Sequence, residues 1–174
     1  TAKSWAKLQT GAVTLGSPAP QTFTSVGGNP ATGPAFDPIA GTSEACKTVT
    51  AEEEPDTADY PTLSAGFTML GLPTVKAHVV ETGRGGESAA RRGVGLPSGE
   101  QRLISRGIYR LDEGQNGDVT FQLHGNGYHF ARGHTVELEL LGRDAPYYQP
   151  MNLPFTVRMR EVAVTLPTLE PAPR

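Results

Sequence analysis

Cysteine is almost missing from this chain. Cys46 is the only one among 174 residues, so no disulfide can form within the chain. A lone cysteine is usually a small buried side chain, although a bridge to another polypeptide would also leave one half-cystine behind. Stability must therefore come from a hydrophobic core, and a chain of this length can form one as a single domain.

Long apolar runs and an excess of positive charge are also lacking. No segment approaches the roughly 20 apolar residues that cross a bilayer, so we expect no membrane partner. The formal net charge is −3, whereas nucleic-acid-binding domains usually carry a strongly basic face, so we expect no nucleic acid. Residues 52–59 hold five acids and no base, and residues 84–110 hold six arginines and two glutamates. We interpret these as a solvated acidic loop and an Arg-lined strand face, with a polyanion or partner site as the alternative.

Helical periodicity is nearly absent. The most helix-like composition, TAEEEPDTAD at 50–59, is interrupted by Pro55 and has no apolar stripe to bury, which predicts a loop. Residues 27–62 as a whole are rich in Gly, Pro, Asn, Thr and acids. They predict a long irregular excursion, which in a compact domain is usually functional or held against a neighbour.

Strand-like alternation is plentiful instead. Three segments place every second residue on one apolar face: 74–81 with Val75, Ala77 and Val79, 117–125 with Val119, Phe121 and Leu123, and 133–142 with Val136, Leu138 and Leu140. The glycine-rich stretch between the last two segments predicts a turn or bulge, so we interpret them as a hairpin-like pair.

Two other strands are less regular. In 101–111, Leu103 and Leu111 share one face and Ile104 lies on the other, so apolar residues occur on both faces of this strand. In 154–167 the alternation slips by one residue near Arg160–Glu161, as a β-bulge would produce.

The strands together indicate a fold class. Further short strands are predicted within 5–16, 21–26 and 64–71. Eight or more short strands without intervening helices predict an all-β antiparallel sandwich or barrel, and the absence of a fixed repeat argues against a propeller or solenoid. We divide the domain into 1–62, with N-terminal strands and the Gly/Pro-rich excursion, 63–167, the main sandwich, and 168–174, a flexible Pro-rich tail.

Patterns for catalysis and metal binding are weak. Ser98 and Ser105 lack the G-x-S-x-G setting of a hydrolase nucleophile, so we expect no catalytic residue in this chain. The four histidines, at 78, 124, 129 and 134, lack HExxH or HxH spacing and are interpreted as surface or hydrogen-bonded side chains. We expect no cofactor and no metal-binding residue, while a calcium ion held by scattered loop oxygens stays open.

Aromatic and polar residues on predicted loops are the remaining candidates for contact with a partner or ligand. They are Trp5, Asn126, Tyr128, Arg143, Asp144, Tyr147 and Tyr148. Exposed aromatic rings beside amides and charges can stack on a sugar, and tyrosines also favour packing on a partner domain. Plain surface and, for Trp5, a place inside the sandwich are the other interpretations.

Two long segments carry a resemblance to a known family. SGEQRLISRGIYRL (98–111) and VTFQLHGNGYHFARGHTVELELLGRDAPYYQPMNLPFTVRMREVAVTLP (119–167) resemble the C-terminal domain of X-Pro dipeptidyl-peptidases and cocaine-esterase-like serine hydrolases. The resemblance implies a jelly-roll, galactose-binding-like β-sandwich beside an α/β-hydrolase domain, which carries the catalytic Ser, Asp and His. The chain departs from the family at AARRGVG (89–95), where two glycines and adjacent arginines predict an irregular edge.

The resemblance implies a non-catalytic accessory domain of a secreted, extracellular serine hydrolase that acts on peptide or ester bonds. The domain would pack on the hydrolase and shape substrate access. At the start of the Arg143–Asp144 turn, Asp144 is expected to accept backbone N–H groups, with Tyr147 and Tyr148 projecting towards the neighbour. A standalone carbohydrate-binding sandwich is the alternative.

Overall fold

The computed structural model describes residues 3–4, 7–16, 19–26, 32–36, 48–50, 57–59, 66–96 and 98–171. The strands are β1 (Gly11–Gly16), β2 (Gln21–Thr24), β3 (Thr48–Thr50), β4 (Thr57–Asp59), β5 (Phe67–Gly71), β6 (Thr74–Gly83), β7 (Gly86–Gly95), β8 (Glu100–Leu111), β9 (Asn116–Gln122), β10 (Asn126–Phe130), β11 (Thr135–Leu141) and β12 (Phe155–Thr168). One short helix, α1 (Thr32–Ala35), precedes β3. The loop prediction for the segment 50–59 is wrong for four residues, because the first residue of this segment ends β3 and its last three residues form β4.

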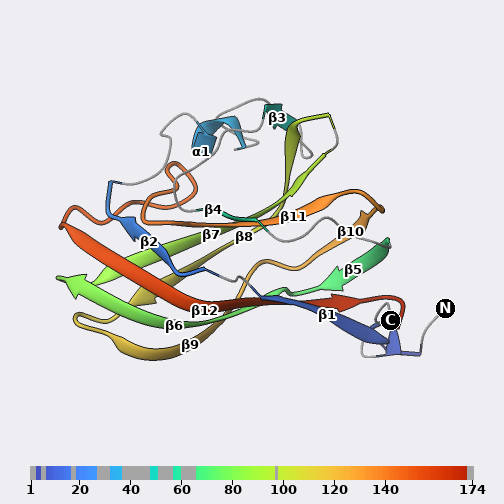
Figure 1. Ribbon diagram of the computed structural model, residues 1–174, viewed down its shortest axis with the longest axis horizontal. Coiled ribbons are helices and arrows are strands. Elements are labelled where there is room, and N and C mark those ends of the chain that lie inside the picture. Colours follow the sequence, from blue (N-terminus) through green and yellow to red (C-terminus); the bar gives the residue numbers. More distant parts are fainter. Residues whose placement is uncertain are drawn as a thin grey trace.

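The strands form two antiparallel sheets. A seven-stranded sheet has the order β10-β5-β12-β6-β9, with β1 and β2 also paired to β12, and a five-stranded sheet has the order β3-β8-β7-β11-β4. Figure 1 shows β6, β9 and β12 in one layer and β7, β8 and β11 in the other. The predicted all-β antiparallel sandwich is confirmed, while its jelly-roll connectivity stays a prediction.

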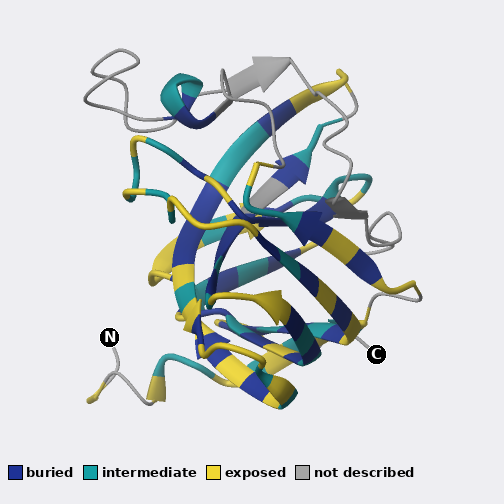
Figure 2. Ribbon diagram, turned by 90° about the vertical axis from the view of Figure 1, so that its left-hand side faces the viewer, coloured by how far each residue is buried: buried dark blue, intermediate teal, exposed yellow. Residues whose placement is uncertain are grey.

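The core lies between the two layers. Figure 2 shows buried and exposed residues alternating along the strands, as expected for sheets with one face packed and one face solvated. The nine residues predicted to point inward from 74–81, 117–125 and 133–142 are all buried. Each large aliphatic side chain buried in this way contributes about 1.5–3 kcal/mol to stability.

The predicted hairpin of 117–125 with 133–142 is wrong. β9 pairs with β6 in the seven-stranded sheet, whereas β11 pairs with β7 and β4 in the five-stranded sheet. The glycine-rich stretch between them holds a strand of its own, β10, which pairs with β5. Alternation specifies which face of a strand is buried, but it does not specify the partner strand.

The segment 89–95 is not an edge. It belongs to β7, which lies between β8 and β11. The expected irregularity is present, because the β7–β8 register shifts between Arg92 and Gly93. This shift also changes the predicted faces of β8, since Ile104 joins the same core cluster as Leu111.

The predicted bulge in β12 is confirmed. The register with β6 shifts between Arg160 and Ala163, and Glu161 has a φ of 55°. After the bulge the strand continues to Thr168, one residue into the segment 168–174 predicted as a flexible tail. The Thr68 backbone N–H and hydroxyl then donate hydrogen bonds of 2.8 Å to the two carboxylate oxygens of Glu170.

Candidate functional site

The connection between β11 and β12 places Asp144 at a buried group of charges. One Asp144 carboxylate oxygen lies 3.7 Å from Nε of Arg91, and the other lies 3.6 Å from Nε of Arg106. Arg91 Nε is also 3.1 Å from Glu139 Oε2. All four side chains are buried. We call Arg91, Arg106, Glu139 and Asp144 the charged cluster.

Strand register brings the cluster together. Arg91 of β7 is directly opposite Arg106 of β8 and directly opposite Glu139 of β11. Since Ala90 and Leu138 belong to the core, these three residues face the outer side of the five-stranded sheet. Two neighbouring arginines would repel each other in a buried site. Asp144 and Glu139 supply the two opposite charges that make their burial tolerable.

A segment of the N-terminal excursion covers the cluster. The Phe36 ring centroid lies 5.7 Å from the guanidinium carbon of Arg91 and 5.9 Å from that of Arg106. Arg106 Nη2 also donates a 3.3 Å hydrogen bond to the carbonyl oxygen of Gly33. Figure 1 shows α1 lying over the outer side of the five-stranded sheet. The Arg-lined strand face predicted from 84–110 is therefore covered here by the chain itself.

Tyr147 packs against its own domain. Its ring centroid lies 5.1 Å from the Arg106 guanidinium carbon, and its hydroxyl is 3.1 Å from Nε2 of His124. The two rings meet edge to face at 5.9 Å. Burial raises the pKa of the Tyr147 phenol, Arg106 opposes this shift and Asp144 adds to it.

Tyr148 is also half-buried. Burial is the main cause that raises the pKa of its phenol, and the nearby carboxylate of Glu87 adds to the shift. The prediction that both tyrosines project outward is therefore wrong, although their role as contacts for a partner stays a prediction. The predicted turn at Asp144 is present, since Tyr147 N–H donates a 3.0 Å bond to the Asp144 carbonyl. The Asp144 carboxylate faces the two guanidinium groups.

Asn126 and Tyr128, two other predicted contact residues, do not join the charged cluster. Asn126 belongs to β10, where Nδ2 donates a 2.7 Å hydrogen bond to the carbonyl of Ile104 and Oδ1 accepts a 2.8 Å bond from Gly127 N–H. Tyr128 packs edge to face on Phe130 at 4.9 Å. Trp5 lies outside the described residues.

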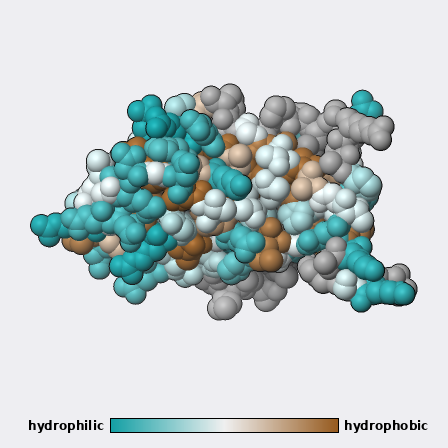
Figure 3. All heavy atoms as spheres, turned by 90° about the horizontal axis from the view of Figure 1, so that it is seen from below, coloured by the Kyte–Doolittle hydropathy of each residue, from teal (hydrophilic) through white to brown (hydrophobic). Residues whose placement is uncertain are grey.

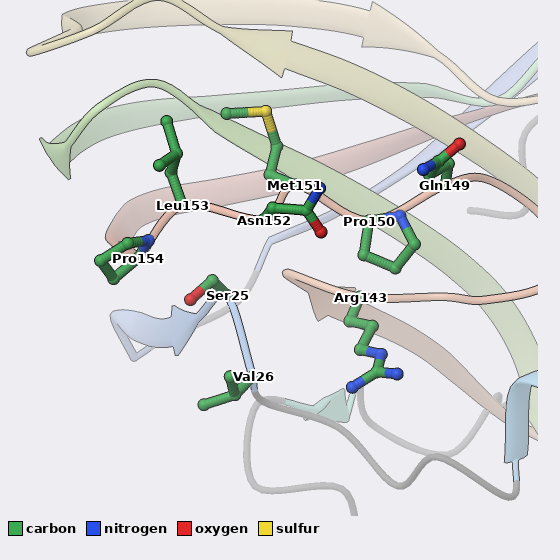
Figure 4. A pocket seen from close by; sticks show the side chains of 9 residues that line it. All are labelled: Ser25, Val26, Arg143, Gln149, Pro150, Met151, Asn152, Leu153 and Pro154. Carbon is green, nitrogen blue, oxygen red and sulfur yellow. The ribbon is translucent and has the colours of Figure 1, made fainter.

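A pocket of about 380 Å³ lies beside the same connection. Its lining residues are Ser25, Val26, Arg143, Gln149, Pro150, Met151, Asn152, Leu153 and Pro154. Figure 4 shows Ser25, Val26 and Arg143 on one side and 149–154 running along the other. Sequence reasoning named Arg143 but missed this pocket, because Ser25 and Val26 lie more than 100 residues before the rest of its lining in the chain. Beside Arg143, the local signal was the pair of apolar residues between Pro150 and Pro154, Met151 and Leu153.

The two serines weighed as nucleophiles, and three of the four histidines weighed as metal ligands, are engaged in other bonds. Ser98 donates to Glu100 Oε2 at 2.9 Å, and Ser105 donates to the backbone carbonyl of His124 at 2.5 Å. His78 Nδ1 is 2.7 Å from Asp118, and His129 Nδ1 is 3.1 Å from the Thr68 hydroxyl. The hydrogen-bonded interpretation is confirmed for these two histidines and for His124.

The described part of the chain also lacks metal-binding groups of three or more side chains and helices that could span a membrane. No group of three or more His, Cys, Asp or Glu side chains there could hold a metal ion. Within the same residues, no helix is long and apolar enough to cross a membrane. Seen from below in Figure 3, the outer face of the seven-stranded sheet is mostly hydrophilic, with scattered hydrophobic side chains.

Comparison with solved structures identifies proteins that share this fold. No family model matches the sequence, and no curated protein matches it. The structure is similar to part of an aminopeptidase from a marine sediment Thaumarchaeota archaeon, with a TM-score of 0.58 and 12% identity over 66% of this chain and 26% of that chain. It is similar to an α-amino acid ester hydrolase, with a TM-score of 0.54 and 16% identity over 66% of this chain and 26% of that chain.

A CocE/NonD family hydrolase from Staphylococcus aureus matches with a TM-score of 0.54 and 12% identity, over 71% of this chain and 32% of that chain. The resemblance stated from the sequence is therefore confirmed at the level of the fold. The chain spans about a quarter to a third of the length of these proteins.

Proposed function

We propose that the chain is a non-catalytic accessory domain of a larger serine hydrolase that acts on peptide or ester bonds. One observation carries the proposal: between 66% and 71% of the chain shares its fold with parts of three hydrolases that are much longer than it is. Fold alone does not specify activity. The parent hydrolase, its substrate class and its secretion are therefore parts of the proposal.

The chemistry of the described residues agrees with an accessory role. A serine nucleophile needs an imidazole within hydrogen-bond reach to accept its proton, whereas Ser98 and Ser105 donate to a carboxylate and a carbonyl. His124, whose backbone carbonyl accepts the bond from Ser105, has its imidazole hydrogen-bonded to Tyr147. These side chains stabilise the sandwich, and we assign catalysis to another domain.

The carbohydrate-binding alternative has less support. Stacking on a sugar needs an aromatic ring that is open to solvent. Tyr147 packs against Arg106 and His124, and Tyr128 packs against Phe130. Both rings are therefore engaged within the domain.

A fluorophosphonate probe tests the proposal on this chain and on its full-length parent protein. We expect covalent labelling of a serine in the parent that lies outside these 174 residues, together with hydrolysis of an activated ester or an aminoacyl anilide. We expect no labelling of the isolated chain. A labelled serine within the chain, or a parent with no labelled serine, would overturn the assignment. Recovery of the parent from the culture medium tests secretion separately.

A further inference from the structure

We infer that the 380 Å³ pocket is the surface through which this domain packs on its hydrolase domain. The pocket receives from that domain an apolar side chain that lies beside a carboxylate. This inference rests on the proposed function and specifies where the two domains meet. It replaces Tyr147 and Tyr148 as the main contact, because both side chains are turned onto the sandwich.

The lining of the pocket has the composition of an interface. Met and Arg are enriched in protein interfaces, whereas charged Lys, Glu and Asp are depleted. The pocket contains Met151 and Arg143 and no Lys, Glu or Asp, and Ser25 is its one residue of a depleted type. Two large hydrophobic residues at the pocket are unusually open to solvent, Val26 at 77% and Leu153 at 43% exposure. Such exposed apolar side chains around a pocket mark a place where a partner side chain can be buried.

The charge at the pocket selects the partner. Arg143 is exposed, while the next residue, Asp144, is buried in the charged cluster. Among the described residues, no ion pair or hydrogen bond to the Arg143 side chain is found. A guanidinium group with unused donors beside the exposed apolar side chains of Val26 and Leu153 is complementary to a carboxylate, which it can bind through two parallel hydrogen bonds. The occupant is therefore an apolar side chain with an acidic neighbour.

The pocket is held in shape before any partner binds. On one side, Ser25 N–H donates a 3.1 Å hydrogen bond to the carbonyl of Phe155, which ties the end of β2 to the start of β12. On the other side, Gly142 lies so close to the carbonyl of Thr24 that a Cβ would overlap it. The Asp144 carboxylate, beside Arg91 and Arg106, holds the connection between β11 and β12 against the five-stranded sheet. A preformed site loses less conformational entropy on binding.

A second pocket, more apolar than the first, supplies a matched control. Leu72 is 47% exposed, close to the value for Leu153, and it lines a pocket of about 450 Å³. The other lining residues are Leu70, Gly71, Gly125, Asn126 and Gly127, so this pocket has no charged residue. Leu72 and Leu153 thus differ in their surroundings while their exposure is similar.

Site-specific photo-crosslinking in the full-length parent tests the inference. p-Benzoylphenylalanine replaces Leu153 in one variant and Leu72 in another, and crosslinked peptides are identified by mass spectrometry. We expect position 153 to crosslink to a hydrolase-domain peptide that contains Asp or Glu, and position 72 to give no such product. Adding Arg143→Glu should lower the crosslink yield at position 153 about tenfold, equivalent to about 1.4 kcal/mol. Arg143→Lys keeps the positive charge but not the two parallel hydrogen bonds, so it should lower the yield by less.

The remaining outcomes separate the two proposals. If position 72 crosslinks to the hydrolase domain and position 153 does not, the domains meet elsewhere and the inference is overturned while the proposed function stands. An unchanged yield with Arg143→Glu would overturn the carboxylate partner. If the parent contains no hydrolase domain, the proposed function fails and this inference fails with it.

Discussion

The guanidinium carbon of Arg106 lies 5.1 Å from the ring centroid of Tyr147. Arg106 comes from β8 and Tyr147 from the connection between β11 and β12, so this contact closes that connection onto the five-stranded sheet. The same guanidinium group also faces Asp144 and Phe36. One arginine therefore holds two separate chain segments against the outer side of the sheet.

Removing a carboxylate from the charged cluster should be costly. We expect Asp144→Ala to lower the free energy of unfolding by about 3–5 kcal/mol, because two buried guanidinium groups would keep only one carboxylate between them. Urea denaturation of the isolated chain measures this change. Arg158→Ala, which removes an exposed arginine from β12, is the control and should change stability by less than about 0.5 kcal/mol. Equal effects of the two substitutions would contradict the buried cluster.

Two substitutions separate the contacts of Tyr147. Tyr147→Phe removes only the hydroxyl that meets His124, so we expect a loss of about 1 kcal/mol or less. Tyr147→Ala also removes the ring over Arg106, which should cost about 1–2 kcal/mol more. Denaturation curves of both variants test the difference. If the Phe and Ala variants are equally stable, the ring does not hold the connection in place.

Tyr147 should also make the stability of the domain depend on pH in the alkaline range. The pKa of folded Tyr147 is raised above its ordinary value of 10.0, mainly by burial. A raised pKa means that the unfolded chain ionises first, so the contribution to stability is full below pH 10.0 and is lost as the pH rises through the folded pKa. Tyr147→Phe should therefore make the loss of stability above pH 10.0 shallower. Unfolding experiments at a series of alkaline pH values, with absorbance titration of the phenols, measure this change. The same slope of unfolding free energy against pH in the native chain and in Tyr147→Phe would contradict the prediction.

The bulge in β12 should be improved by glycine. Glu161 has a φ of 55°, a region that costs a residue with a Cβ about 1–2 kcal/mol and costs glycine little. Since glycine also loses more entropy on folding, we expect Glu161→Gly to raise stability by up to about 1 kcal/mol. Glu161→Ala keeps the Cβ and should give no gain. Thermal denaturation distinguishes them, and a more stable Ala than Gly variant would contradict the strained conformation.

Glu170 should make the end of β12 sensitive to acid. Hydrogen bonds from the Thr68 backbone N–H, and then from its hydroxyl, hold the pKa of Glu170 below its ordinary value of 4.5. A lowered pKa contributes stability that is present above pH 4.5 and is lost as the pH falls through the folded pKa. Glu170→Gln should therefore be slightly less stable than the native chain at pH 7, and the difference should shrink below pH 4.5. Hydrogen exchange of the Thr68 amide reports this locally, and protection independent of pH would argue against the bond.

Local pattern determined much of the sandwich. Side chains alternate with a period of two along any strand, so the sequence was sufficient to identify the inward faces of β6, β9 and β11. It was also sufficient to place the β12 bulge at Arg160–Glu161, since one extra residue reverses the alternation. The family resemblance rested on the order and spacing of motifs in 98–111 and 119–167. The fold that it implied is confirmed by the similarity to solved hydrolases.

Tertiary structure decided everything that depends on which strands meet. Strands pair through backbone groups that every non-proline residue carries, so the alternation of β9 and β11 could not indicate that they belong to different sheets. For the same reason, nothing local in AARRGVG revealed a central strand whose Arg91 is neutralised by Glu139 and Asp144. The burial of a charge depends on partners supplied from distant segments. The direction of Tyr147 and the pocket beside Arg143 were settled in the same way, by contacts between residues far apart in the chain.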